Sequence, residues 1–519
     1  MNFDVIITSD RTMMSNHHGK EFLGFIATGP PLGLPEHLWM WMCAPKPKVD
    51  KMGRPLEAPY GLRKIEASLI NAGINAAVID PDYLNRYLKH AKILMVGHHD
   101  FFAMCSPSIE WWLITGSEPL NSRSFKRFMR KPEIREAKKH GLKIIVGGPA
   151  AWQWLWRTDY WREFGVDTVV EGEADKVIVE LANKVFNGED LPLYVYVGPG
   201  DSPSLNEIPD IKGASVNGLI EITRGCPRKC RFCSVTLRPL RHYPLDKIER
   251  EIRVNVHAGL KNCIFHSEDV LMYGSIGIEP NLDLLIQLHK LAKKYCKIVT
   301  WSHATLALVK YSQEKYNLIS RLTEILYDDN QEWIGVEVGI ETGSSRLVGE
   351  IMPAKAAPYP VSKWPEVVRD AFAIMHEHKI VPAATLILGL PNEQEEDTTA
   401  TLELLDELSG YRSIIVPMFF VPLGSLKDKA WFLRNHLTDQ HVEILRKCLW
   451  HSIKWAEDIL SNMYLKGVYY APLKTLLKFF IAYVKKKGKE AEKTLVKLRH
   501  EEVAQPKFKN QLLPTLTPI

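Results

Sequence analysis

Three cysteines stand within eight residues of one another in the stretch Thr223-Arg-Gly-Cys-Pro-Arg-Lys-Cys-Arg-Phe-Cys-Ser234. The spacing C-x3-C-x2-C places three thiolates, those of Cys226, Cys230 and Cys233, on one short loop. Iron–sulfur clusters are held by cysteine thiolates, and a cubane cluster needs four ligands to saturate its irons. The loop therefore predicts a 4Fe–4S cluster with one iron left open to another molecule.

A structural zinc site is the alternative use of these cysteines. Zinc takes four ligands, commonly in paired C-x2-C or H-x3-H groups, and the sequence has no second pair. The five remaining cysteines are scattered singles, Cys43, Cys105, Cys263, Cys296 and Cys448. Such scatter is unlike a disulfide framework and favours a reducing cytoplasm.

Composition restricts the class of protein further. A chain of 519 residues with 46% hydrophobic and 24% charged residues is typical of a folded globular protein of two or three domains. Its formal net charge of +5 does not by itself argue for nucleic acid, and we expect no nucleic-acid partner. The N-terminus lacks the pattern of a signal peptide and no uncharged run reaches membrane-span length, so we expect a cytoplasmic protein.

The cysteine loop resembles that of the radical S-adenosylmethionine superfamily, and the aromatic Phe232 before the last cysteine fits the family's pattern. In this family the open iron chelates the amino and carboxylate groups of S-adenosylmethionine and passes an electron into its sulfonium. The resemblance implies an enzyme that uses a 4Fe–4S cluster and S-adenosylmethionine. It also implies an external electron donor such as ferredoxin or flavodoxin.

The first 200 or so residues read as an α/β unit. Short apolar runs, separated by helical patterns, predict strands of a parallel sheet at Phe3–Thr8, Lys92–Val96, Lys143–Val146 and Thr168–Val170. The third run ends at Gly147-Gly148, where backbone without side chains would let a macrocycle or nucleotide tail approach. A plain strand-to-loop turn would need such glycines too. The segment resembles the cobalamin-binding Rossmann-like domain that often precedes a radical S-adenosylmethionine barrel, which implies cobalamin as a third cofactor.

One departure from the cobalamin pattern concerns the axial ligand. The Asp-x-His-x-x-Gly sequence that ligates cobalt is absent, and Ser15-Asn-His-His-Gly19 stands near the first strand instead. No axial histidine is assigned, and the histidines of this region are expected to be ordinary loop residues. The aromatic-rich stretch from Glu21 to Lys64 is expected to be an irregular insertion that caps the corrinoid, lines a route for an apolar substrate, or packs on its own domain.

The turn-rich segment Val197-Gly-Pro-Gly-Asp-Ser-Pro-Ser204 predicts a linker, after which strands and helices alternate again. The predicted strands are Leu219–Thr223, Cys263–Phe265, Ile298–Ser302, Trp333–Val338, Ala384–Ile387 and Ile414–Val416. This pattern resembles the partial (β/α)6 barrel of the superfamily, in which chemistry sits at the carboxyl ends of the strands. We therefore predict an α/β protein with a cobalamin-binding-like Rossmann domain over residues 1–205, a radical SAM barrel over 206–430 and a C-terminal helical domain over 431–519.

Motifs at the predicted strand ends supply candidate cofactor-binding residues. In His266-Ser-Glu-Asp269, either Glu268 or Asp269 is placed as in the family to accept from the methionine ammonium, although Ser and Asp after a strand also commonly cap helices. The segment Gly335-Val-Glu-Val-Gly-Ile-Glu-Thr-Gly-Ser344 resembles the family's Gly-x-Glu-[Ser/Thr]-Gly-Ser signature. That resemblance places Glu341, Thr342 and Ser344 at the ribose or the methionine moiety. Gly389 in Leu386-Ile-Leu-Gly-Leu-Pro-Asn-Glu393 resembles the glycine that lies near the adenine.

Two tyrosines near predicted strand ends, Tyr243 and Tyr273, are candidates to hand a proton or a hydrogen atom to the substrate, and nothing in the sequence selects between them. Near the C-terminus, Leu473–Lys487 combines an apolar face with clustered lysines. That pattern is shown by a peripheral membrane helix and equally by a terminal helix docked on the barrel. A peripheral membrane helix would favour a lipid substrate.

The resemblance covers roughly residues 1–430 and implies a cobalamin-dependent radical enzyme. Its leading function is C-methylation of an unactivated carbon in a peptide, a protein or a small molecule, initiated by a 5′-deoxyadenosyl radical. The same pair of domains also serves carbon–carbon coupling, including ring formation in archaeal tetraether lipids. A non-catalytic corrinoid or cluster sensor is the third alternative. The identity of the substrate is not encoded in any motif.

Overall fold

In this computed structural model, which describes residues 2–19, 21–31, 33–464 and 471–498, contacts divide the chain into two units. Of the described residues, unit 1 holds those up to Ile220 together with Leu245–Lys261, and unit 2 holds Glu221–Pro244 and those from Asn262 onward. The segment Leu245–Lys261 thus packs with unit 1 although it lies within the stretch predicted as the barrel. The functional boundaries at 205/206 and 430/431 stay predictions, because a division by contacts follows packing rather than chain order.

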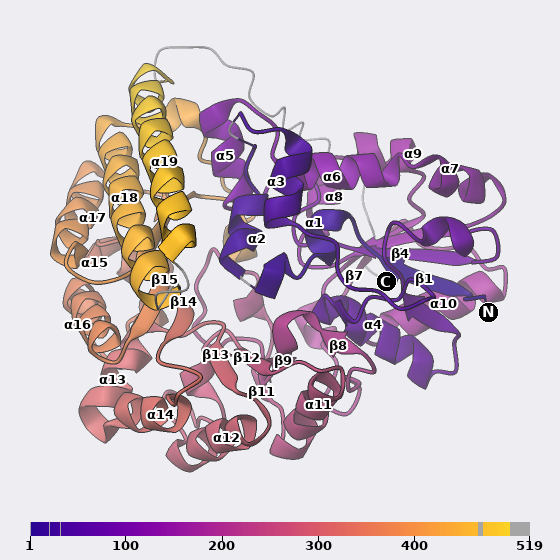
Figure 1. The fold of residues 1–519 in the computed structure, drawn as a ribbon, viewed down its shortest axis with the longest axis horizontal. Helices are drawn as coiled ribbons and strands as arrows, with labels where there is room; N and C mark the ends of the chain where they lie inside the picture. Colours follow the sequence, from indigo (N-terminus) through magenta and orange to yellow (C-terminus); the bar gives the residue numbers. More distant parts are fainter. Residues whose placement is uncertain (1, 20, 32, 465–470, 499–519) are drawn as a thin grey trace. The chain divides into compact units, whose positions relative to one another are not determined.

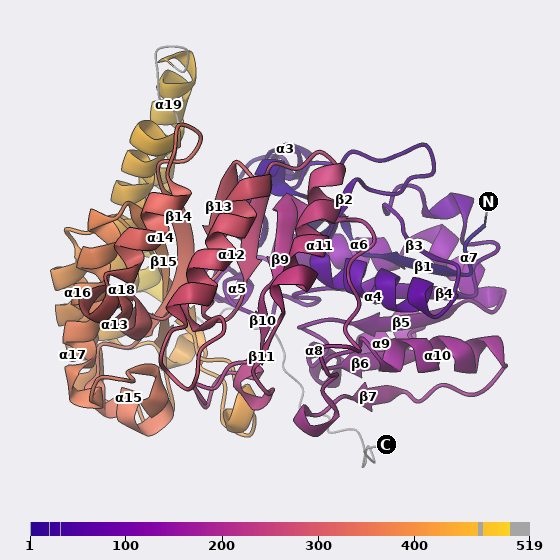
Figure 2. The same ribbon diagram turned by 90° about the horizontal axis from the view of Figure 1, so that it is seen from below.

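Unit 1 is built on a parallel six-stranded sheet (Figure 2) with the order β3-β1-β4-β5-β6-β7. Its strands are β1 (Val5–Thr8), β3 (Ala76–Val78), β4 (Ile93–Gly97), β5 (Lys143–Gly147), β6 (Thr168–Glu171) and β7 (Tyr194–Tyr196). The four strands predicted from the sequence are confirmed, each within two residues at its ends. The two that were missed, β3 and β7, are only three residues long, which is too short for an apolar run to stand out.

The strand order of unit 1 places a switch point between β1 and β4. The chain leaves β1 for β3 on one side and then crosses to β4 on the other. This is the doubly wound order of flavodoxin-like sheets, in which ligands bind beyond the carboxyl ends of the two strands at the switch. The strand interiors are apolar and fully buried, and they pack against residues of α4 and α10.

The helices of unit 1 surround this sheet (Figure 1). They are α1 (Arg11–Met14), α2 (Glu21–Ala27), α3 (Glu36–Cys43), α4 (Tyr60–Asn71), α5 (Ser108–Thr115), α6 (Leu120–Met129), α7 (Pro132–Lys139), α8 (Gln153–Trp156), α9 (Asp159–Phe164), α10 (Val177–Phe186) and α11 (Leu245–His257). The short strands β2 (Glu57–Ala58) and β8 (Ala214–Ser215) pair with each other. The expectation of an irregular insertion over Glu21–Lys64 is therefore wrong in part, because this stretch contains α2, α3, β2 and the start of α4, with a small core around Trp39 and Cys43.

Unit 2 contains the predicted partial barrel (Figures 1 and 2). Its strands are β10 (Thr223–Arg224), β11 (Arg241–His242), β12 (Asn262–His266), β13 (Ile298–Trp301), β14 (Ile334–Glu341), β15 (Ile380–Leu388) and β16 (Ile414–Phe419). The strand orders are β13-β12-β9, with β9 at Leu219–Glu221, and β14-β15-β16. A parallel bridge between His303 and Glu337 joins the two sets. The predicted α/β class and β/α alternation are confirmed.

Helices follow the barrel strands in the chain and cover them. They are α12 (Leu282–Tyr295), α13 (Leu306–Tyr316), α14 (Leu318–Leu326), α15 (Ser345–Ile351), α16 (Trp364–Glu377), α17 (Glu395–Leu408), α18 (Asp439–Asp458) and α19 (Ala471–Leu498). Helix α18 packs on the edge strand β16, where Ser452 Oγ accepts from Ile415 N at 3.0 Å and donates to Ile415 O at 2.9 Å. These bonds occupy backbone groups that an open sheet edge would expose.

The segment Leu473–Lys487 lies within α19, but the side chains of residues 471–477 fall outside the described part of the chain. In the part that is described, Ile481 is buried and Lys485 pairs with Glu457 of α18 at 2.6 Å. Lys487 pairs with Glu490 on the same helix at 2.7 Å. This much of α19 shows packing against α18. No helix among the described residues is long and apolar enough to cross a membrane.

Replacing Lys64 by Met is expected to destabilise unit 1 by about 3–5 kcal/mol, because it leaves the buried carboxylate of Glu251 without its cation. Lys64 Nζ lies 2.5 Å from Glu251 Oε1, and both side chains are under 5% exposed. The matched control is Lys184→Met, which breaks an ion pair with Glu180, whose side chain is 66% exposed. This change is expected to cost less than about 1 kcal/mol. Chemical denaturation of the two variants measures the difference, and equal losses would contradict the role assigned to Lys64.

Candidate active site

The cysteine loop is held at both ends by a short antiparallel ladder. Strand β10 before the loop pairs with β11 after it, with Thr223 opposite His242 and Arg224 opposite Arg241. Arg224 itself forms two hydrogen bonds of 2.8 Å with the carboxylate of Glu221. The loop therefore leaves and re-enters the barrel at one place, with its cysteines between the two strands.

The three thiols of the loop are free, two of them buried and the third, that of Cys233, half-buried. Burial raises the pKa of Cys226 to about 12 and that of Cys233 to about 11. Burial also raises the pKa of Cys230, and the positive charge of Lys355 opposes that rise. Backbone N–H groups of Arg228, Val235 and Thr236 donate to the sulfurs of Cys226 and Cys233 and favour their thiolate forms.

These features fit a bound cluster. Buried thiols with raised pKa values become thiolates when a metal centre takes the place of their protons, and N–H···S bonds are a known means of tuning a cluster. No group of three or more His, Cys, Asp and Glu side chains among the described residues is arranged to hold a single metal ion.

Arg228, inside the loop, is the residue that anchors it. Its guanidinium is 4% exposed and donates to Ala354 O at 2.9 Å, to Ala357 O at 2.8 Å and to Thr305 Oγ1 at 3.0 Å. It also lies 3.6 Å from the carboxylate of Asp269. Sequence reasoning missed Arg228, because an arginine between cysteines looks like any surface cation until its partners are known.

The structure separates the two carboxylates that the sequence left as alternatives. Asp269 accepts from Leu271 N at 3.2 Å and from Thr305 Oγ1 at 2.5 Å, so it caps the short 3-10 helix Val270–Met272. Burial raises its pKa, and the nearby Arg228 opposes that rise. Glu268 is only half-buried and makes no hydrogen bond or ion pair within the described chain, yet its charge acts on Cys226 and Cys233. Which of the two carboxylates contacts the methionine ammonium stays a prediction.

Glu341, at the end of β14, forms a buried ion pair with Lys355, a residue that sequence reasoning missed. Its other oxygen accepts from Thr385 Oγ1 at 3.0 Å. A side chain at Gly339 would overlap this pair, which explains one glycine of the signature. Burial alone would lower the pKa of Lys355, but the charges of Glu341 and Cys230 outweigh it and raise that pKa. Lys355 thus places a buried cation between a carboxylate and the cysteines.

The hydroxyl groups of Thr342 and Ser344 are engaged inside the protein. Thr342 Oγ1 accepts from Ser344 N at 3.1 Å and lies 3.3 Å from Thr401 Oγ1. Ser344 caps α15 by accepting from Leu347 N at 3.3 Å, and it donates to Asp397. Their contacts to S-adenosylmethionine stay predictions, and the structure adds that both hydroxyls already order the turn after β14.

Gly389 lies at the end of β15 with a φ of +75°. Its N–H donates to Glu393 Oε2 at 2.8 Å, and that oxygen also lies 2.7 Å from His441 Nε2 on α18. A Cβ at this position would collide with the ring of Phe432 at 1.9 Å, so only glycine fits. The glycine thus serves a close approach by Phe432, and its predicted contact with the adenine remains a prediction.

The two candidate tyrosines are joined to each other. Tyr243 is 1% exposed and donates to Glu221 Oε2 at 2.8 Å, while Tyr273, 2% exposed, donates to the carbonyl of Tyr243 at 2.8 Å. Their catalytic roles stay predictions. A more accessible proton-handling group is the pair of His303 Nε2 and Glu337 Oε2, 3.1 Å apart and 35% and 38% exposed. This pair lies after β13 and in β14, and only tertiary structure brings it together.

In unit 1 the predicted residues Gly147 and Gly148 lie close to the backbone of neighbouring strands. A Cβ on Gly148, whose φ is +107°, would lie 2.8 Å from His98 O, and one on Gly147 would lie 3.2 Å from Val170 O. The glycines therefore allow two strand ends to pack closely, and a ligand contact there stays a prediction.

Beside them, at the switch point, lies a buried polar cluster. His98 Nε2 contacts Asp10 Oδ1 at 2.8 Å, and Asp100 accepts from Asn121 and Gln153 at 3.0 and 2.6 Å. Burial would raise the pKa of Asp10, but the charge and hydrogen bond of His98 outweigh it and lower that pKa.

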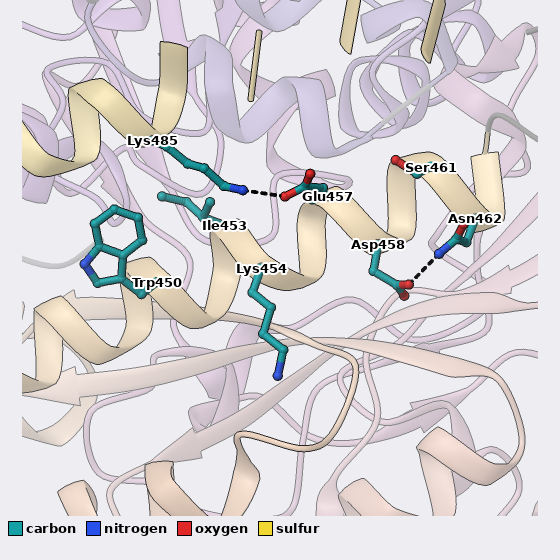
Figure 3. A pocket seen from close by; sticks show the side chains of 8 residues that line it. All are labelled: Trp450, Ile453, Lys454, Glu457, Asp458, Ser461, Asn462 and Lys485. Atoms are coloured by element: carbon teal, nitrogen blue, oxygen red, sulfur yellow. Dashed lines mark hydrogen bonds and ion pairs between the residues drawn. The ribbon is translucent and has the colours of Figure 1, made fainter. Parts of the chain in front are cut away.

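A separate hollow of about 420 Å³ lies on unit 2 along α18 (Figure 3). Trp450 and Ile453 contribute to one end, and Glu457, Asp458 and Lys485 line the rest. Two contacts join residues of the lining, the Lys485–Glu457 ion pair and a hydrogen bond of 2.7 Å that Asn462, just after α18, donates to Asp458. The hollow contains none of the predicted site residues.

Comparison with known proteins agrees with this site. Residues 220–405 match the sequence profile of the radical SAM superfamily. The tRNA-2-methylthio-N(6)-dimethylallyladenosine synthase of Bacillus subtilis (strain 168) is 24% identical over 259 residues, 48% of this chain and 47% of that protein. Ribosomal protein uS12 methylthiotransferase RimO of Thermodesulfovibrio yellowstonii is 24% identical over 192 residues, 36% of this chain and 41% of that protein. The chain thus spans about half the length, or less, of these relatives.

A solved structure also aligns with the chain. It is that of the radical S-adenosylmethionine methyltransferase TsrM from Kitasatospora setae with cobalamin and a 4Fe–4S cluster bound, covering 86% of this chain and 78% of that chain at 13% identity and a TM-score of 0.48. At this score the alignment carries no conclusion on function. The profile match shows that a radical SAM domain is present. It confirms the prediction of an enzyme that uses a 4Fe–4S cluster and S-adenosylmethionine.

Replacing Cys226, Cys230 or Cys233 singly by Ala is expected to abolish the cluster, because a cubane with an open iron has no spare thiolate. Anaerobic reconstitution followed by iron analysis and visible absorption measures the loss. Cys263→Ala and Cys448→Ala, which alter buried cysteines outside the loop, are the matched controls and should keep the full iron content. An unchanged iron content in any loop variant would contradict the ligand assignment.

Proposed function

We propose that this protein is a cobalamin-dependent radical SAM enzyme that methylates an unactivated carbon of a peptide, a protein or a small molecule. The observation that carries the proposal is the cysteine loop, anchored by Arg228 and flanked by one available carboxylate, Glu268, and one buried cation, Lys355. A zwitterionic amino acid group needs both an acceptor and a positive charge beside the open iron.

The residues around the loop bind and orient S-adenosylmethionine. Glu268 accepts from the ammonium group, and Lys355, already paired with Glu341, provides the positive charge for the carboxylate end. When bound, the cluster, S-adenosylmethionine and cobalamin supply a hydrogen-abstracting radical and a transferable methyl group. The His303–Glu337 pair accepts a proton from the substrate where the reaction releases one, because it joins a histidine just after β13 to a carboxylate within β14 and is 35% and 38% exposed.

Cobalamin is assigned to the switch point of unit 1. The hydroxyl of Ser9, just beyond β1, and the Oδ1 atom of Asn121 are buried without a hydrogen-bond partner in the structure. Buried polar atoms without partners are uncommon and mark a place where a ligand can supply them. The strand order supports the same location, since doubly wound sheets bind their ligands at the switch.

The histidines near this place are engaged by the protein. His98 uses both ring nitrogens, on Asp10 at 2.8 Å and on the N–H of Asp100 at 2.7 Å. His17 contacts Cys43 O at 2.6 Å, and the exposed His18 contacts Trp41 O at 3.3 Å. These contacts support a corrinoid bound without a histidine ligand to cobalt.

Carbon–carbon coupling of a lipid is the second candidate, favoured by apolar side chains exposed on α2 and α3. Trp41 is 68%, Leu38 42% and Phe25 38% exposed. Large exposed apolar side chains that lie close together often mark a site for an apolar ligand or a membrane. The relatives named for tRNA and a ribosomal protein match only about half of this chain, so their substrates are not carried over to it.

Product analysis decides between the candidates. The full chain, purified without oxygen and supplied with cobalamin, is expected to form S-adenosylhomocysteine beside 5′-deoxyadenosine, and its bound cobalamin should show the spectrum of the form whose dimethylbenzimidazole base is detached from cobalt. Coupling yields 5′-deoxyadenosine alone, and a sensor yields neither in turnover amounts. Loss of cobalamin on gel filtration would reject the corrinoid while leaving the radical SAM assignment in place.

Glu268→Gln is expected to weaken S-adenosylmethionine binding about tenfold or more while keeping the cluster, because a hydrogen bond to a charged group contributes about 1.5–3 kcal/mol. Asp269→Asn, the isosteric change at the next residue, should instead lower the thermal stability, since Asp269 caps a helix and pairs with Arg228. Calorimetric titration of each reconstituted variant with S-adenosylmethionine measures the difference. A normal affinity in Glu268→Gln would transfer the role to another carboxylate.

A further inference from the structure

A cluster buried in a loop must receive its electron through a particular part of the surface. This step rests on the proposed function. Of the three cysteines, Cys226 and Cys230 are buried and Cys233 is half-buried, so the loop is most open to solvent at Cys233. The surface around Cys233 is therefore the first place to look for an electron donor.

Two segments form that surface. The carbonyl of Arg231 accepts from Ser425 N at 2.9 Å and from Ser425 Oγ at 3.1 Å, so the segment after β16 packs directly on the cysteine loop. The carbonyl of Cys233 accepts from Thr236 Oγ1 at 2.9 Å, in a short 3-10 helix (Val235–Leu237) that contacts the 3-10 helix Gly424–Leu426. We call the exposed residues of these segments, Lys229, Arg231, Leu237, Lys427 and Lys429, the redox-loop surface.

The redox-loop surface is positively charged. Its four cations are exposed, and none forms an ion pair with another residue in the part of the chain that the structure describes. Asp428 is the acidic residue between the two lysines of the second segment. The nearby Glu350, whose carbonyl lies 3.4 Å from Arg231 Nη1, has its carboxylate engaged by Arg346 and Asn392.

We propose that the redox-loop surface docks a small acidic electron-carrier protein. The carrier is oxidised by one electron and the cluster is reduced by one, with no proton or atom transferred. Charge complementarity steers such an encounter and orients it, and it is weakened by salt. Leu237, 43% exposed, lies among the cations and provides the apolar contact at which the two proteins exclude water.

A protein partner fits this surface better than RNA. Sites for RNA combine extended basic grooves with aromatic side chains on which bases stack. The redox-loop surface is confined to two short segments, has the acidic Asp428 beside it, and contains the aliphatic Leu237. Its nearness to the cysteines also serves electron transfer and has no use in holding a nucleic acid.

The test uses the reconstituted full chain and reduced flavodoxin, an acidic one-electron carrier, as the probe. The variant Lys427→Glu/Lys429→Glu reverses two charges outside the cysteine loop. It is expected to raise the KM for flavodoxin at least tenfold in the formation of 5′-deoxyadenosine, and to reduce the dependence of that KM on salt. With dithionite, a small-molecule reductant that needs no docking, its rate should equal that of the unchanged protein.

The matched control is Lys290→Glu/Lys297→Glu, which makes the same change in charge on exposed residues of α12 and just before β13. It should behave as the unchanged protein with both reductants. An equal rise of KM in the two variants would show a general effect of net charge and overturn the proposal. So would a normal KM in Lys427→Glu/Lys429→Glu, including the case in which that variant instead loses affinity for a labelled RNA.

Zero-length carbodiimide cross-linking gives a readout that does not depend on turnover. It joins lysine amines to flavodoxin carboxylates within a docked complex, and mass spectrometry identifies the lysines. Cross-links are expected at Lys229, Lys427 or Lys429, and cross-links confined to other lysines overturn the proposal. If the unchanged protein forms these cross-links yet cleaves no S-adenosylmethionine with dithionite, the proposed function fails while the docking surface stands.

Discussion

The buried guanidinium of Arg228 is the interaction on which the site depends. It joins the cysteine loop to the carbonyl groups of Ala354 and Ala357, to the hydroxyl of Thr305 and to the carboxylate of Asp269, which come from segments far apart in the chain. A buried charge is stable only when such partners satisfy it, and removing one partner costs several kcal/mol. These contacts tie the cysteine loop to three other segments of the chain and so help to set the positions of the three thiols.

Charges of both signs surround the thiols. The carboxylates of Glu268 and Asp269 disfavour a further negative charge on Cys226, and Lys355 favours one on Cys230. The N–H groups of Arg228, Val235 and Thr236 add donors that need no change of geometry. A site with this mixture can carry the negative charge of a thiolate cluster and still offer an acceptor to an ammonium group and a cation to a carboxylate. The buried pair of Glu341 and Lys355 also ties the end of β14 to the segment after α15, because neither charge is stable without the other.

The strands of both units end in polar residues for a shared physical reason. A parallel sheet buries its strand interiors on both faces, so polar side chains gather where the strands end. In unit 1 the ends of β1 and β4 carry Asp10 and His98, and in unit 2 the ends of β12 and β13 carry the serines and histidines of the barrel opening. The glycines found at these ends serve close packing of the chain itself. Gly148 approaches the backbone of His98, and Gly389 lies under the ring of Phe432.

The sequence by itself determined the alternation of strands and helices, the location of the cysteine loop and the class of chemistry, because apolar periodicity and cysteine spacing are local properties. It located every long strand of both units but shortened β14, β15 and β16 by three or more residues, and it missed very short strands such as β3 and β7 of unit 1. Tertiary structure alone decided that Asp269 is engaged by Arg228 and Thr305, that Lys355 pairs with Glu341, and that His303 meets Glu337. These roles depend on partners tens of residues away in the chain, and a side chain's burial, charge balance and hydrogen bonds exist only once the chain has brought those partners together.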